Sequence, residues 1–259
     1  MADRVKARSR RPTASADGSR PPCIRCVSSY EREARERGFS RVAGVDEVGR
    51  GCLFGPVFAA AVILDPARPI RGLHDSKILE AKQRSQLAAQ IKARCIAWAV
   101  RGADVFEIDQ INIYQASRLA MKRAVEALAT QPDFLLVDAI NIDLPIEQLA
   151  LIDGDARCRA IAAASIIAKV HRDACLTQWH EVFPQYNLLS NKGYSTPDHK
   201  RALREHGATL LHRFSFEPVR LNCSRVFWTD YMTGPPIQAE LFDSETETEV
   251  MAAAGASVD

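Results

Sequence analysis

Apolar residues recur with the spacings of strands and helices between residues 23 and 235, so this part of the chain is expected to fold. Two apolar runs, 42–46 and 57–64, are predicted strands, and the glycine-rich segment 49–56 between them predicts a hairpin-like pair. Shorter runs at 95–100, 134–137 and 149–152 predict three more strands. The run 134–137 is continuously apolar and ends in Asp138, which is typical of a buried parallel strand.

Helical periodicity separates these strands. Ser76 is a plausible N-cap for a helix over 76–94, and residues 113–129 fit an amphipathic helix that Pro132 prevents from continuing. Small residues predict a helix over 159–171, and 197–205 fits another. Strands that first pair in sequence and then alternate with helices imply an α/β fold. Its mixed sheet would be flanked by helices and followed by a helical C-terminal portion.

The two ends of the chain differ from this body in composition. Residues 1–22 are basic, with a charge of +4, and contain almost no large apolar residues, so we expect a disordered N-terminal extension. Residues 236–259 carry a charge of −6 and predict a disordered acidic tail. The body keeps +4, which permits a polyanionic partner but is equally typical of an ordinary solvated surface.

Composition excludes several classes of protein. The longest apolar run has only the eight residues 57–64, too few to span a membrane, and no apolar segment follows the basic N-terminus as in a secretory signal. Seven cysteines without disulfide-like spacing favour reduced thiols and a cytoplasmic location. Cys23 and Cys26 form a lone C-x-x-C, which we interpret as incidental rather than as a zinc site. The sequence has no P-loop, which argues against an ATP-driven enzyme.

Four acidic residues stand where predicted strands end. Asp46 and Glu47 close the first strand, Asp138 closes the fourth, and Asp155 follows the fifth. If these strands are neighbours, the carboxylates converge and repel one another unless divalent cations lie between them. Oxygen ligands suit Mg²⁺ or Mn²⁺, and two such ions about 4 Å apart support phosphodiester hydrolysis. Taken singly, each acid is more commonly a turn or helix-cap residue.

Six segments resemble the type 2 ribonuclease H family, and in particular its bacterial ribonuclease HII members, in order and in spacing. They are GVDEVGRGCLFGPVFAAAVIL, HDSKIL, EIDQINIYQASRLAM, FLLVDA, IAAASIIAKVHRD and KGYSTPDH. The resemblance extends over about residues 30–219 and implies a ribonuclease H-like fold. It implies hydrolysis of the RNA strand of RNA/DNA hybrids, and cleavage 5′ of ribonucleotides embedded in duplex DNA, that leaves 3′-hydroxyl and 5′-phosphate ends.

The family's acidic quartet falls on Asp46, Glu47, Asp138 and Asp155. The resemblance implies that these residues are both the catalytic residues and the ligands of two Mg²⁺ or Mn²⁺ ions. The residues around Asp155 depart from the family's usual pattern, so Asp173 is a rival for the fourth position.

The resemblance also implies substrate contacts. Gly49, Arg50 and Gly51 would approach the ribose 2′-hydroxyl at an RNA–DNA junction, a contact by which a protein distinguishes RNA from DNA. Tyr194 would sense the deoxyribose that follows the ribonucleotide. Without the resemblance, a tight hairpin and a buried core tyrosine are the commoner explanations.

Three lysines are candidate phosphate contacts, because backbone charge dominates affinity for nucleic acids: Lys77, Lys169 and Lys192. We expect a monomer that acts on hybrid and on ribonucleotide-containing DNA duplexes. A DNA nuclease or resolvase on the same fold is an alternative enzyme. A non-catalytic binding module would have lost one or more carboxylates, but all four are present.

The acidic tail contains one further motif. Gln238, Leu241 and Phe242 have the Q-x-x-L-F form that resembles the peptide by which bacterial replication proteins dock on the sliding clamp. Packing of Leu241 and Phe242 against the enzyme's own surface is the alternative.

Overall fold

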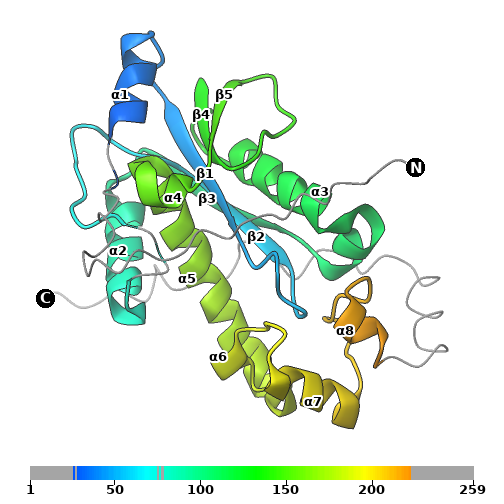
Figure 1. The fold of residues 1–259 in the computed structure, drawn as a ribbon. Coiled ribbons are helices and arrows are strands. Elements are labelled where there is room, and N and C mark those ends of the chain that lie inside the picture. Colours follow the sequence, from blue (N-terminus) through cyan, green and yellow to red (C-terminus); the bar gives the residue numbers. More distant parts are fainter. Residues whose placement is uncertain (1–25, 27, 75, 77–78, 223–259) are drawn as a thin grey trace, which may run out of the picture.

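A five-stranded mixed sheet forms the centre of the computed structural model, which describes residues 26, 28–74, 76 and 79–222 (Figure 1). The strands are β1 Val42–Val48, β2 Val57–Ile63, β3 Ala97–Ala103, β4 Phe134–Asp138 and β5 Glu147–Leu151. The helices are α1 Ser29–Glu36, α2 Ala81–Arg94, α3 Val105–Glu126, α4 Gly154–Arg157, α5 Arg159–Val182, α6 Leu188–Asn191, α7 Pro197–His206 and α8 Glu217–Arg220, with a 3₁₀ turn at Pro184–Tyr186.

The strand order is β3-β2-β1-β4-β5. Strands β1, β2 and β3 pair antiparallel as a meander, and β4 and β5 continue the sheet parallel to β1. The central strand β1 therefore has an antiparallel neighbour on one side and a parallel neighbour on the other. As expected for a central position, β2 is buried along its whole length.

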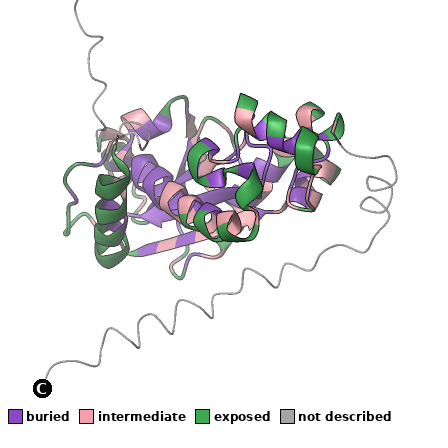
Figure 2. Ribbon diagram, turned by 90° about the horizontal axis from the view of Figure 1, so that it is seen from below, coloured by how far each residue is buried: buried purple, intermediate pink, exposed green. Residues whose placement is uncertain are grey.

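Helices cover the two faces of the sheet. One apolar cluster joins α3 to side chains such as Val45 and Val137, while α2 and α5 pack on the opposite face (Figure 1). All eight residues from Ile161 to Ala168 on α5 are buried, and half of them are alanine, so this helix lies close to the strands. Figure 2 shows the buried residues gathered in the sheet and on this inner stretch of α5.

The closest approach is between α5 and β1. A Cβ atom added to Gly44 would lie 2.1 Å from the carbonyl carbon of Ala160, so no side chain fits between strand and helix at this point. Gly44 thereby fixes how near the first turn of α5 comes to the strand that ends in Asp46.

Helix α3 contains a local break. Asp104 and Glu107 form a capping box at its beginning, and Asn112 then has a φ of 66°, outside helical geometry. The Asn112 side chain accepts hydrogen bonds from the backbone N–H groups of Tyr114 and Gln115, so it caps the part of the helix that begins at Ile113.

The C-terminal helices form a separate apolar cluster beside the end of the sheet, around Phe54, Leu176 and Phe214 (Figure 1). Isolated β-bridges join Cys52 to Tyr194 and Phe54 to His212. The segment that follows the β1 turn is therefore held by residues from the far end of the sequence.

These findings confirm the predicted mixed sheet, its flanking helices and the helical C-terminal portion. The five predicted strands are present: three of them begin at the predicted residue, and the other ends are shifted by one to three residues. The helix predicted from Ser76 is wrong at its start, because α2 begins at Ala81 with Glu80 as its cap, and the Ser76 hydroxyl instead hydrogen-bonds Ser165 at 2.9 Å. Helix α5 continues to Val182, well beyond the predicted residue 171.

The predicted disordered ends, 1–22 and 236–259, lie outside the described residues, as does Cys23. Within the described part of the chain, no helix combines the length and apolar character required to cross a membrane.

Replacing Gly44 with Ala is expected to lower the free energy of unfolding by about 3 kcal/mol, because the added methyl group collides with backbone that cannot move independently of α5. Chemical denaturation measures the change. Gly51→Ala is the matched control, since its Cβ would stand at an ordinary 3.8 Å from Tyr194 Cε1. Equal stability of the two variants would contradict the close packing of α5 on β1.

Candidate active site

Two carboxylates are brought together by the parallel pairing of β1 and β4. Val45 pairs with Val137, so the residues that follow them, Asp46 and Asp138, lie side by side at the carboxyl ends of adjacent strands. Asp46 also pairs with Ala60 on β2, whose methyl side chain leaves space around the acid. The register of the sheet therefore creates the pair without any loop.

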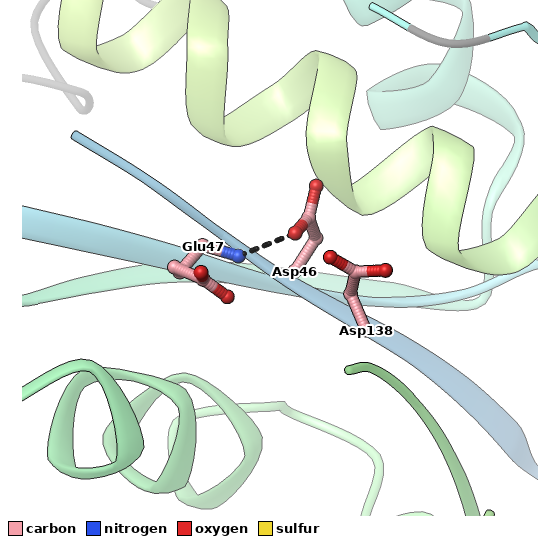
Figure 3. Close-up of side chains that lie close together, drawn as sticks. All are labelled: Asp46, Glu47 and Asp138. Carbon is pink, nitrogen blue, oxygen red and sulfur yellow. Dashed lines mark hydrogen bonds between the residues drawn. The ribbon is translucent and has the colours of Figure 1, made fainter. Parts of the chain in front are cut away.

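Glu47 completes a three-carboxylate group. One oxygen from each of Asp46, Glu47 and Asp138 can be chosen such that all three lie within 4.8 Å of one another. Figure 3 shows Asp46 directed toward α5 with Asp138 beside it, while Glu47 lies on the other side of β1. Asp46 also accepts a 2.7 Å hydrogen bond from the backbone N–H of Glu47, which fixes the orientation of its carboxylate.

Burial and like charge act together on Asp46, whose side chain is almost entirely inaccessible. Desolvation raises the pKa of Asp46 well above its ordinary value, and the charges of Glu47, Asp138 and Asp155 raise it further, against a hydrogen bond from Ser165 that lowers it. The protein by itself thus disfavours the ionised form of this acid.

Glu47 has a partial counterion. Burial raises the pKa of Glu47, and the charge of Arg50, whose Nη1 lies 3.2 Å from Glu47 Oε1, opposes that increase. The arginine of the Gly-Arg-Gly turn is therefore directed back at the acidic group.

Asp155 and Asp173 differ in their surroundings. Asp155 is buried at the start of α4, and the preceding Gly154 donates its N–H to Asp138 Oδ1 at 2.7 Å. Asp173 is bound by Lys169 at 2.6 Å and by Arg84 at 3.8 Å. Because Asp155 acts electrostatically on Asp46 whereas Asp173 is neutralised on α5, the geometry favours Asp155 as the fourth acid.

The residues fit a divalent cation. Three carboxylates converge in a poorly solvated place with one partial counterion, and added positive charge there would relieve the repulsion that raises the pKa of Asp46. Hard oxygen donors of this kind suit Mg²⁺ and Mn²⁺, whereas zinc sites generally include sulfur or nitrogen.

The Gly-Arg-Gly turn runs beside a buried arginine. Gly49 has a φ of +92°, and a Cβ at this position would come within 2.7 Å of Arg172 Nε. Arg172, on α5, is 1% exposed and donates to Cys52 Sγ at 2.9 Å and to the Lys192 carbonyl at 2.7 Å. One guanidinium group thus bridges the turn and the loop that contains Tyr194.

Tyr194 is 45% exposed, which rules out a buried core tyrosine. Its ring borders the turn, since a Cβ on Gly51 would lie 3.8 Å from Cε1, and Arg172 lies 5.9 Å from the ring centroid. The structure therefore places together both segments to which the family resemblance assigns substrate contacts.

A second buried arginine supports the turn from the other side. Arg213 donates to the carbonyl oxygens of Arg50 at 2.7 Å, Gly55 at 2.9 Å and Pro56 at 3.1 Å. Burial lowers the pKa of Arg213 to about 10, which leaves the guanidinium charged at neutral pH. Its fixed fork of donors holds the chain on both sides of the residues between Arg50 and Gly55.

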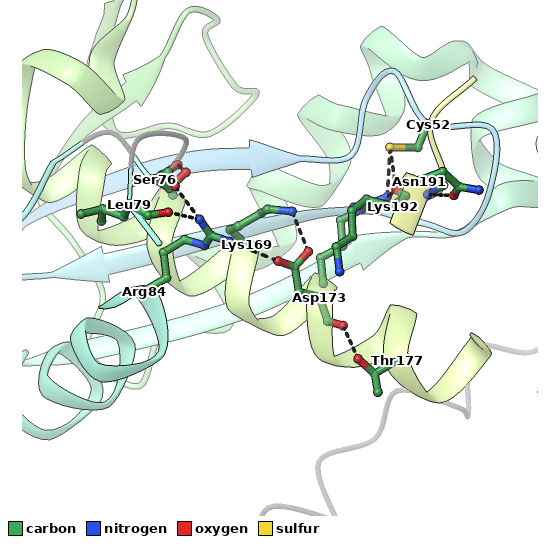
Figure 4. Close-up of polar contacts among 12 residues, drawn as sticks. Cys52, Ser76, Leu79, Arg84, Lys169, Asp173, Thr177, Asn191 and Lys192 are labelled. Carbon is green, nitrogen blue, oxygen red and sulfur yellow. Dashed lines mark hydrogen bonds and ion pairs between the residues drawn. The ribbon is translucent and has the colours of Figure 1, made fainter. Parts of the chain in front are cut away.

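The candidate phosphate ligands differ in availability. Lys77 lies outside the described residues. Lys169 is bound to Asp173, and Figure 4 shows this ion pair between Arg84 on one side and Lys192 on the other. Lys192 has a left-handed backbone, with a φ of 51°, and its side chain is partly exposed.

Several contributors were missed from sequence. Arg172 and Arg213 follow histidines in the chain, but nothing in a His-Arg pair reveals that its guanidinium will be buried against backbone carbonyls. Ser165 was missed as well, although its hydroxyl bonds both Ser76 and Asp46.

Known proteins that are similar to this chain are described as ribonucleases HII. The model of the family described as Ribonuclease HII matches residues 43–219. Ribonuclease HII of Solibacter usitatus is 60% identical over 197 residues, which cover 76% of this chain and 86% of that protein. Ribonuclease HII of Myxococcus xanthus is 46% identical over 242 residues, 92% of this chain and 80% of that protein.

Solved structures have the same fold. The ribonuclease H2 of Pyrococcus horikoshii superposes with a TM-score of 0.64 at 24% identity, over 75% of this chain and all of that one. The RNase HII in a PCNA:RNase HII complex from Archaeoglobus fulgidus gives a TM-score of 0.59 at 25% identity, over 69% of this chain and 96% of that chain.

The fold, the acidic group and these relatives define the class: the protein is a ribonuclease H, an endonuclease that hydrolyses RNA. Within that class, the chain belongs to the ribonuclease HII family.

The raised pKa of Asp46 predicts a pH-dependent change in stability of the metal-free protein. Because the folded-state pKa lies above the unfolded one, the folded state binds the proton more tightly, and stability falls as pH rises between the two values. In Asp46→Asn the side chain cannot ionise, so the variant does not lose this stability as pH rises. Its melting temperature at pH 8 should exceed that of the wild type by about 3 °C, and the gap should close toward pH 4.

Asp173→Asn is the matched control, because it removes a carboxylate that two cations stabilise and should lower the melting temperature at pH 8. Millimolar Mn²⁺ should raise the melting temperature of the wild type and not that of Asp46→Asn. A metal-free wild type at least as stable as Asp46→Asn at pH 8 would contradict the crowded acidic group.

Proposed function

We propose that this protein cuts the RNA strand of RNA/DNA hybrids and cuts 5′ of ribonucleotides embedded in duplex DNA, by two-metal-ion catalysis. The observation that carries the proposal is the position of the Gly-Arg-Gly turn. It leaves β1 directly after the acidic group and is flanked by an exposed tyrosine. The segment proposed to contact the ribose therefore lies next to the residues proposed to hydrolyse the phosphodiester.

In the proposed reaction, Asp46 and Asp138 hold the cations while Glu47 and Asp155 complete the site. When bound, Mg²⁺ or Mn²⁺ activates a water molecule and stabilises the leaving oxygen. The water oxygen forms a bond to phosphorus as the P–O3′ bond breaks, which leaves a 3′-hydroxyl and a 5′-phosphate. The N–H groups of Glu47 and Gly154 hold the carboxylates of Asp46 and Asp138 in fixed orientations.

Substrate reading is assigned to the two adjoining segments. The backbone of Gly49, Arg50 and Gly51 would contact the ribose 2′-hydroxyl, and the absence of side chains at both glycines allows a close approach. The exposed ring of Tyr194 would pack against the deoxyribose on the far side of the cut.

Phosphate contacts are assigned to the lysines. Lys192 adjoins the tyrosine loop with a partly exposed side chain, and Lys169 would exchange its bond to Asp173 for a phosphate. Lys77, outside the described residues, remains a candidate from the sequence alone.

Asp46→Asn should keep the fold but reduce cleavage of a DNA duplex with one ribonucleotide by more than 1,000-fold. The substitution removes the proposed metal ligand that lies beside both Glu47 and Asp138. Rates are measured in Mg²⁺ and in Mn²⁺, with duplex binding measured separately. Asp143→Asn, at an exposed position in the loop between β4 and β5, is the control. Activity above about a tenth of the wild-type rate would refute a metal-ligand role, and cleavage of an all-DNA duplex would indicate a DNA nuclease instead.

Replacing Tyr194 with Ala should slow cleavage at a single ribonucleotide about tenfold more than cleavage of a uniform hybrid. Only the first substrate presents a deoxyribose beyond the cut. Tyr114→Ala is a matched control, since Tyr114 is also 45% exposed but lies on α3. Equal losses on both substrates would show that Tyr194 is merely structural.

We also propose that Gln238, Leu241 and Phe242 of the acidic tail dock on a sliding clamp; these residues lie outside the described part of the chain. The complex of PCNA with an RNase HII from Archaeoglobus fulgidus shows that a relative binds such a partner. A labelled peptide of residues 237–242 should bind bacterial clamp in the micromolar range, roughly −8 kcal/mol. A double-alanine peptide at positions 241 and 242 that binds equally well would disprove it.

A further inference from the structure

Two histidines are completely buried in the helical C-terminal portion, where the proposed reaction makes no use of them. His199 lies in the first turn of α7, and His212 lies in the loop that follows this helix. Their Nε2 atoms are 3.2 Å apart. The rings of Phe54 and Tyr186 pack against His212, with centroids 4.9 Å and 4.7 Å away, so the pair has apolar surroundings.

The outer partners fix the proton positions on both rings. The backbone N–H of Thr209 can only donate, so His212 Nδ1, at 2.9 Å, accepts from it, and the Thr209 hydroxyl lies 3.0 Å from the same nitrogen. The carbonyl of Tyr194 can only accept, so His199 Nδ1, at 3.0 Å, carries a proton and donates. His212 must then carry its proton on Nε2 and donate it to the bare Nε2 of His199. The two neutral rings are opposite tautomers.

A proton added to His199 would disrupt this chain of hydrogen bonds. Charged His199 would oppose the N–H of His212 with a second N–H at 3.2 Å, unless His212 moved its own proton to Nδ1 beside the Thr209 hydroxyl. Burial lowers the pKa of His199 and lowers that of His212 to about 3. The carboxylate whose charge acts on His199, that of Asp198, already binds Asn187 and Arg201 at 3.0 Å and 2.5 Å.

The pair connects the two segments that would read the substrate. At one end, His199 holds the carbonyl of Tyr194. At the other end, the backbone of His212 bridges to Phe54, and the next residue, Arg213, donates its N–H to the Leu53 carbonyl at 2.9 Å. Leu53 and Phe54 follow the Gly-Arg-Gly turn after Cys52.

Thr196 strengthens the connection to Tyr194. Its N–H donates to the same Tyr194 carbonyl at 2.8 Å, and its hydroxyl caps α7 by accepting the N–H of His199 at 3.2 Å. Tyr194 is therefore anchored by its backbone to the start of α7 while its ring stays half exposed.

We propose that His199 and His212 are positioning residues that set the distance between Tyr194 and the Gly-Arg-Gly turn, and thereby the preference for an RNA–DNA junction. This proposal rests on the substrate-reading role proposed above for Tyr194. The pair is a fixed spacer, since neither ring gains a proton near neutral pH.

The tautomers are tested directly by ¹⁵N NMR of the uniformly labelled full chain, which contains six histidines. Two should stay neutral between pH 7 and pH 8, one with its proton on Nδ1 and one with its proton on Nε2. Spectra of His199→Asn and His212→Gln assign the two signals. Equal tautomers, or a charged ring at pH 7, would overturn the proposal without reference to activity.

Cleavage rates test the positioning role. His199→Phe removes both ring hydrogen bonds and should lower the ratio of single-ribonucleotide to uniform-hybrid cleavage about tenfold. His199→Asn keeps a donor near the Nδ1 position and should keep the ratio within about twofold of the wild type. In a Tyr194→Ala background, His199→Phe should not change the ratio further.

The possible failures are distinguishable. If Tyr194→Ala alone leaves the ratio unchanged, the proposed role of Tyr194 fails, and the histidine proposal fails with it. If Tyr194→Ala lowers the ratio but His199→Phe slows both substrates equally, only the histidine proposal is overturned. The histidine proposal would also be overturned if folded His199→Asn protein lowered the ratio of single-ribonucleotide to uniform-hybrid cleavage as much as His199→Phe does.

Discussion

The close packing of α5 on β1 is the constraint from which the site follows. Gly44 leaves no space for a side chain against Ala160, and the alanine-rich inner stretch of α5 lies flat on the strands. This contact buries Asp46 beside Ser165 and creates the desolvation that favours a bound cation over a bare carboxylate. A longer side chain at either contact would separate the helix from the acids that it covers.

The same helix organises the remainder of the site along its length. Asp155 lies just before its first turn, and Arg172, four turns further on, bridges the turn after β1 and the tyrosine loop. The acidic residues and the segments proposed to contact the substrate are thus positioned by the same helix, α5. Rigid support of this kind keeps a site within the narrow geometric tolerance that catalysis requires.

Sequence patterns could predict the sheet and most of the acidic group because both depend on local order. A buried apolar run that ends in an acid, as at Asp138, predicts a strand end, and parallel pairing then brings such ends together. The choice between Asp155 and Asp173 could not be made in this way. It depends on Arg84, which reaches Asp173 from a helix far away in sequence. Likewise, Ser76 has the residue type of a cap, but a tertiary bond to Ser165 uses its hydroxyl.

Arg213 gives the substrate-reading turn a particular response to ionic strength. Its three hydrogen bonds to carbonyl oxygens are buried, so mobile ions do not screen them, whereas contacts between surface lysines and phosphate weaken steeply as salt displaces them. Salt should therefore affect the affinity for the duplex and the discrimination between sugars differently. If the proposed roles hold, rising ionic strength weakens the binding of the duplex, while the shape of the turn, and with it the proposed discrimination between ribose and deoxyribose, stays constant.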